Sequence, residues 1–159
     1  MQERERDPAG RTRNARPRDR HGRPLPRGAV GVERVPDDVV FGPDDGVAEA
    51  QRLLDAGLPF PAHDVLESVW KAAPPAEREV WRALAQVAVG LTHAQRGNPR
   101  GAVALLRRAV DGLGRWVGPA PAGVDLDGVR AHADELARRI EGSGLGDLTA
   151  TDLRIRLRE

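Results

Sequence analysis

The residues of this sequence whose types could do chemistry gather in one short stretch, PAHDVLESVWKAA, from Pro61 to Ala73. It contains His63, Asp64, Glu67 and Trp70. A histidine beside two carboxylates could work as an acid/base pair, hold a metal ion or form a hydrogen-bond network. The stretch is therefore the first candidate for a functional site.

The spacing of these residues predicts which of them share a helix face. Prolines open and close the stretch, as is typical of a helix. At about 100° per residue, Glu67 lies about 40° from His63, and Trp70 lies about 20° to its other side. We therefore expect His63, Glu67 and Trp70 to point inward, with Asp64 on the flank. Ionisable groups that face a core need partners, because without them burial shifts their pKa values so that the neutral form is favoured.

The next predicted helix offers such partners. It is apolar over most of its circumference, which is typical of a helix in the middle of a bundle. Gln86 and His93 lie on its one polar side. If the two helices pack antiparallel, His63 and Glu67 could meet Gln86 and His93 in one polar pocket.

Three hypotheses follow for this pocket. In the first, His63, Glu67 and His93 bind a divalent metal such as zinc or iron, and the protein is a metal-dependent hydrolase. In the second, Glu67 and His63 act without metal on a bound small molecule. The third, which we favour, is a structural network or a ligand site without chemistry. The sequence assigns no catalytic residue, and the candidate pocket comprises His63, Asp64, Glu67, Trp70, Gln86 and His93.

Apolar periodicity and turn residues predict the elements that must position these groups. They indicate an all-α, antiparallel bundle of about five helices in a domain spanning residues 43–145. The final segment, 146–159, alternates apolar and charged residues and is expected to lie extended on the bundle. The expected helices cover residues 43–57, 59–73, 75–97, 98–116 and 124–142.

The N-terminal region differs in composition from the rest. Residues 1–34 contain ten arginines and five acids, a net charge of +5, whereas the remainder carries −4. Residues 1–36 are rich in Arg, Pro and Gly and have no apolar periodicity, which predicts a disordered basic arm. The arm has no aromatic residue to stack on bases, which argues against a nucleic-acid partner.

The composition also limits compartment and partners. There is no cysteine, so disulfides, thiolate metal sites and cysteine nucleophiles are excluded. No apolar run reaches the roughly 18 residues of a membrane-spanning helix, and the N-terminus has no signal-peptide pattern, so a cytoplasmic protein is expected. A homodimer through apolar helix faces around Trp116 is a further possible assembly.

The motifs together resemble the family catalogued as domain of unknown function 309. Its members carry an H-E-x-x-E-x-x-W-like segment, then a helix reading roughly L-x-G-L-I-Q-x-A-x-x-x-x-H, then G-N-x-x-G-A-x-x-L. The resemblance covers about residues 47–117. The matching residues are His63, Asp64, Glu67 and Trp70, then Leu84, Gln86, Ala88 and His93, then Gly97, Asn98, Gly101, Ala102 and Leu105.

Two positions depart from the family pattern. Asp64 replaces the usual glutamate and is one methylene shorter, which would change its reach toward a ligand. Ala85 replaces the usual glycine. The resemblance implies a small all-helical protein and implies no established activity.

Overall fold

The computed structural model describes residues 39–158 and confirms the all-α prediction. That part of the chain forms five α-helices and one short 3₁₀ helix, and it contains no β-strand. The helices are α1 (Pro43–Asp55), α2 (Pro59–Ala72), α3 (Arg78–Gln95), α4 (Pro99–Gly114), η1 (Pro121–Gly123) and α5 (Leu126–Ser143). The predicted arm, residues 1–36, lies outside the described residues.

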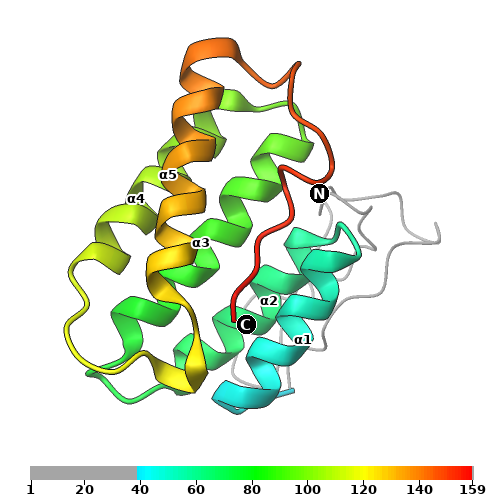
Figure 1. Cartoon of the computed structure of the whole chain (residues 1–159). Helices are drawn as coiled ribbons and strands as arrows, with labels where there is room; N and C mark the ends of the chain where they lie inside the picture. Colours follow the sequence, from blue (N-terminus) through cyan, green and yellow to red (C-terminus); the bar gives the residue numbers. More distant parts are fainter. Residues whose placement is uncertain (1–38, 159) are drawn as a thin grey trace, which may run out of the picture.

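The helices pack in the order of the chain. Each of the four helix pairs that are neighbours in sequence forms an extensive interface, and α3 lies between α2 and α4 (Figure 1). Short connections join them, which favours antiparallel neighbours. The helix that carries the candidate site, α2, is therefore held between α1 and α3.

Helix α3 supplies the centre of the core. Of its 18 residues, 11 are buried, and Trp81 and Leu84 are fully inaccessible. Gly90 lets α4 approach closely, because a Cβ atom at this position would lie 2.9 Å from Cγ of Leu106. A helix that is apolar on most sides is buried on most sides.

Side-chain caps fix the starts of the last two helices. The Oδ1 atom of Asn98 accepts a hydrogen bond from the Gly101 amide, and Oδ1 of Asp125 accepts one from Gly128, both at 3.0 Å. Both residues are therefore side-chain N-caps. The third helix begins at Arg78 rather than at Pro75, because the residues after the proline pair form a turn in which the Glu77 amide donates to the carbonyl of Pro74.

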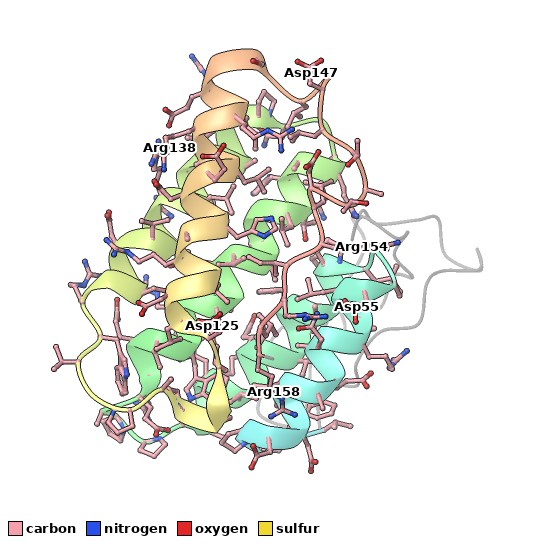
Figure 2. All side chains as sticks on the ribbon, viewed as in Figure 1. Asp55, Asp125, Arg138, Asp147, Arg154 and Arg158 are labelled. Carbon is pink, nitrogen blue, oxygen red and sulfur yellow. The ribbon has the colours of Figure 1, made fainter. Side chains whose placement is uncertain are left out.

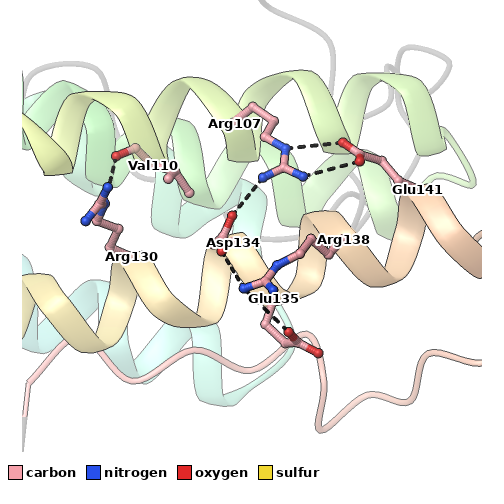
Figure 3. Close-up of polar contacts among 7 residues, drawn as sticks. All are labelled: Arg107, Val110, Arg130, Asp134, Glu135, Arg138 and Glu141. Atoms are coloured by element: carbon pink, nitrogen blue, oxygen red, sulfur yellow. Dashed lines mark hydrogen bonds and ion pairs between the residues drawn. The ribbon is translucent and has the colours of Figure 1, made fainter.

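Charged side chains join α4 to α5 on the outside of the bundle (Figure 3). Arg107 lies 2.7 Å from Asp134 and 3.2 Å from Glu141, and Nε of Arg130 donates to the carbonyl of Val110 at 3.3 Å. These groups are largely exposed, so each pair contributes little by itself. Together they fix the register of the last helix pair.

The chain after α5 returns along the bundle and ends beside α1 (Figure 1). Turns occupy most of residues 145–153, and Ile155 and Leu157 are then buried to 2% and 1% exposure. Figure 2 labels Arg154 and Arg158 along this segment, with Asp55 and Asp125 on flanking elements. The apolar side of the segment thus completes the core.

Within residues 39–158, no helix has both the length and the apolar character needed to cross a membrane.

Candidate functional site

One face of α2 carries three charged groups at helical spacing, His63, Glu67 and Lys71, which we call the α2 row. The Nε2 atom of His63 lies 3.0 Å from Oε2 of Glu67, and Nζ of Lys71 lies 2.6 Å from Oε1 of the same carboxylate. Residues four apart on a helix are neighbours, so the i, i+4 spacing produces both contacts. Glu67 therefore has one cationic partner on each oxygen.

The second nitrogen of His63 lies close to Asp64. The distance from Nδ1 to Oδ1 of Asp64 is 3.6 Å, too long for a hydrogen bond. Nδ1 is buried and makes no hydrogen bond with the described residues. The Asp64 carboxylate thus acts on this nitrogen through its charge.

These contacts set the protonation states of the row. Burial disfavours the imidazolium form of His63, but the carboxylates of Asp64 and Glu67 outweigh burial and raise its pKa from 6.5 to about 9. The hydrogen bond from His63, helped by Lys71, lowers the pKa of Glu67 from 4.5 to about 2 despite partial burial. At neutral pH the row is therefore an imidazolium, a carboxylate and an ammonium.

This charge state limits the chemistry of the row. A general base needs an available lone pair and a pKa near the working pH. Protonated His63 has no free lone pair, and Glu67, with a pKa near 2, is a weak base whose two oxygens are already engaged. The arrangement suits an ion-pair row better than an acid/base pair.

The row lies at the edge of the buried face of α2. The side chains of His63 and Glu67 are 21% and 29% exposed, so they are half-buried. The helical wheel predicted that they point inward, whereas they lie at the edge of the core. The core side of the helix carries Ala62, Val65, Leu66 and Val69, all of which are buried. Gly46 on α1 packs directly against Val69, which turns that side of α2 inward.

Aromatic groups border the N-terminal end of the row. The ring of Phe60 lies 5.8 Å from the ring of His63, and the guanidinium of Arg96 lies 5.6 Å from the Phe60 ring centroid. Trp70 is half-buried and packs against the core on the same helix. The predicted proximity of Trp70 to the apolar core agrees with this packing.

His93 belongs to a different group, at the turn between α3 and α4. Its Nδ1 atom lies 3.1 Å from Nδ2 of Asn98, whose Oδ1 caps α4. Partial burial and the charge of Arg96 lower the pKa of His93 below 6.5. Neutral His93 therefore accepts a hydrogen bond from the amide of the cap residue.

Gly101 makes this turn possible. A Cβ atom at position 101 would lie 2.7 Å from Nδ1 of His93 and 2.6 Å from Nδ2 of Asn98. Gly97, between the two helices, has φ of +75°, a conformation that favours glycine. The pattern H-x-x-x-G-N-x-x-G in this chain is thus explained by a tight, capped helix–helix turn.

The candidate residues therefore fall into two groups. His63, Asp64 and Glu67 lie together on α2, whereas His93 pairs with Asn98. Gln86 is half-buried on α3, and no hydrogen bond or ion pair within residues 39–158 joins it to either group. In the same part of the chain, no three His, Cys, Asp or Glu side chains form a group that could hold a metal ion.

Two polar residues outside the predicted pocket have specific roles that the sequence analysis missed. His132 is half-buried, and its Nε2 lies 2.9 Å from the carbonyl oxygen of Asp152. The amide of Gln51 bonds to the backbone of Ile155 and Leu157. No local signal marks either residue, because both partners are distant in the sequence.

Comparison of the chain with curated proteins and with solved structures gave no match. The family model described as Domain of unknown function (DUF309) matches residues 47–105. The matched residues extend from α1 into the first half of α4 and include the α2 row and the capped turn. Over this segment, which holds all the candidate residues, the chain resembles the DUF309 family.

Proposed function

We propose that this protein is a non-catalytic helical protein with a structural or ligand-binding function. In it, the α2 row stabilises the helix array. The observation that carries this proposal is the double pairing of Glu67, with His63 on one oxygen and Lys71 on the other. The pairing occupies both carboxylate oxygens of Glu67 and the Nε2 atom of His63, which an acid/base mechanism would need to be free.

The rival hypothesis is a metal-dependent hydrolase using His63, Glu67 and His93. A metal binds neutral imidazole, so it would have to displace a proton held with a pKa near 9 at His63. The His93 lone pair on Nδ1 already accepts from Asn98. Both observations favour the structural role of the row.

Thermal and chemical unfolding of the full chain at pH 7, with and without zinc chloride, tests the proposal. We expect Glu67→Gln to lower the free energy of unfolding by about 1–2 kcal/mol, since a hydrogen bond to a charged group is lost. Glu79→Gln is a matched control, because within residues 39–158 Glu79 pairs with the exposed Arg115 alone, and its effect should stay below about 0.5 kcal/mol. We expect zinc to leave the melting temperature unchanged.

A zinc-dependent rise in the melting temperature that disappears in His63→Ala would overturn the proposal in favour of a metal site. Equal effects of Glu67→Gln and Glu79→Gln would show that the row has no special structural role.

The compartment and the partners belong to the same proposal. A chain without cysteine is suited to the reducing cytoplasm, which we infer as its location. For a homodimer, the loop after α4 is the candidate surface, since Val117 is 90% exposed beside the half-buried Trp116. Light scattering of wild type and Val117→Asp over a range of concentrations tests this surface, and a wild type that stays monomeric at all of them would exclude it.

A further inference from the structure

The segment of residues 153–158 binds the helix array in the way that an extended peptide binds a receptor. Ile155 and Leu157 are buried, whereas the alternating residues Arg154 and Arg156 are exposed. In strand-like recognition, backbone hydrogen bonds provide affinity and alternate side chains provide specificity. Both components are present here.

Gln51 of α1 forms hydrogen bonds with the backbone of this segment. Its Nε2 donates to the carbonyl of Ile155 at 3.0 Å, and its Oε1 accepts from the amide of Leu157 at 2.7 Å. One side-chain amide thus presents a donor and an acceptor to one edge of an extended chain, as a neighbouring strand would. The carbonyl of Leu157 in turn accepts from the Asp125 amide at 2.8 Å.

The contacts of the following residue add charge and a further backbone partner. The Nη1 atom of Arg158 lies 3.4 Å from Oδ1 of Asp44 and 3.2 Å from the carbonyl oxygen of Ala122. Asp44 begins the acidic first turn of α1. We call the surface formed by Asp44, Gln51, Ala122 and Asp125 the tail site.

The connection between α5 and this segment is held by exposed polar contacts, by the half-buried contact of His132 with the Asp152 carbonyl, and by leucines that pack at the edge of the core. Asp152 pairs with Arg139 at 2.8 Å and accepts from the Thr149 amide at 2.8 Å. Gly144, where the chain leaves α5, has φ of +69°. The helices pack extensively with their neighbours in sequence, so most contacts within the helix array do not involve the segment.

We propose that the tail site is a binding site for an extended segment with the pattern apolar–Arg–apolar–Arg, filled here by the chain's own residues 155–158 and also able to take the same segment of a second copy. A second copy is the occupant that supplies this pattern with every contact already matched. Exchange of identical segments between two copies keeps all contacts and is a low-cost route to a dimer. This inference is independent of the role of the α2 row.

The first test uses a full-chain variant, Ile155→Asp/Leu157→Asp, whose own segment can no longer be buried while the tail site is unchanged. The probe is a fluorescent synthetic peptide with the sequence of residues 149–159, and fluorescence anisotropy measures its binding. We expect the variant to bind the peptide at least about tenfold more tightly than wild type, because the wild-type segment competes at high effective concentration. Adding Gln51→Leu should weaken binding about tenfold, through loss of two hydrogen bonds.

A control peptide with aspartate at the positions of Ile155 and Leu157 should not bind. If the variant does not fold alone, the probe peptide should restore its helical circular dichroism, which reports the same binding event. A variant that neither binds the peptide nor is restored by it would overturn the proposal.

The second test asks whether another copy can supply the segment. The Ile155→Asp/Leu157→Asp variant, with an intact tail site, is mixed with full-chain Gln51→Leu, whose segment is intact but weakly held. Light scattering should detect in the mixture a 1:1 complex of the two variants that neither sample forms alone. Peptide binding without this complex would overturn the second copy as the occupant.

Discussion

Two histidines of the motifs, His63 and His93, differ in charge at neutral pH: His63 is protonated and His93 is neutral. His63 lies between Asp64 and Glu67, which raise its pKa to about 9. Partial burial and the charge of Arg96 lower the pKa of His93, whose Nδ1 contacts the neutral amide of Asn98. Each histidine is half-buried, so partner identity rather than exposure separates them.

This difference shows why a motif of reactive residue types need not be one site. Residues four apart on α2 form an ion-pair row, whereas His93 contacts Asn98, five residues on, whose side chain caps α4. His63 contributes to the ion-pair row of α2, and His93 at the end of α3 contacts the residue that caps α4. The following predictions test this separation, from the largest expected effect to the smallest.

The largest effect is expected at the capped turn. Gly101→Val would place side-chain atoms where Asn98 and His93 now lie, and we expect a loss of about 3 kcal/mol in the free energy of unfolding. Gly142→Ala is the control, because no atom lies within 4 Å of the added Cβ. Chemical denaturation of the full chain measures both. A loss in Gly101→Val no larger than the change in the control would contradict the close packing of this turn.

A smaller effect, with a distinct pH dependence, is expected at His63. Its folded pKa of about 9 exceeds the unfolded value near 6.5, so the folded state binds more protons between these values. The stability from its charge is full below about pH 6.5 and is lost as the pH rises through about 9. The difference between wild type and His63→Gln should therefore fall by about 1–3 kcal/mol across this window.

His93→Gln is the matched control for that titration. Because the folded pKa of His93 is lowered, its contribution should instead rise with pH and should change only below about pH 6.5. Opposite slopes in adjacent pH windows would establish the contrast between the two histidines. A difference for His63→Gln that is constant from pH 6 to 10 would count against the ion-pair row.

The smallest effect is expected from Asn98, and it separates capping from the contact with His93. Asn98→Ala should cost about 1 kcal/mol, as expected for loss of a helix N-cap. Asn98→Asp keeps the acceptor that caps α4 but removes the Nδ2 donor to His93, so it should cost less. Thermal unfolding of both variants measures this order, and the reverse order would make the His93 contact the more important one.

Much of the fold could be predicted from the sequence. Apolar periodicity and turn residues predicted the five helices. These features depend on residues a few positions apart, which is why sequence reasoning finds them.

The orientation of α2 could not be predicted in the same way. The helical wheel was oriented by the large side chains near His63, whereas the buried face of α2 is set by Ala62, Leu66 and Val69, of which Val69 packs against Gly46 of α1. Gln51 and His132 were missed because their partners lie 104–106 and 20 residues away, respectively. Contacts of that kind depend on how complete helices pack, which spacing within one helix does not reveal.

The bond between Gln51 and the segment near Leu157 also affects the order of folding during synthesis. Helices that pack with their sequence neighbours make mostly local contacts, which favours rapid folding. The bonds from Gln51 span more than 100 residues and can form only after Leu157 has left the ribosome. Before that point, the helices can pack with one another while the tail site is still uncovered.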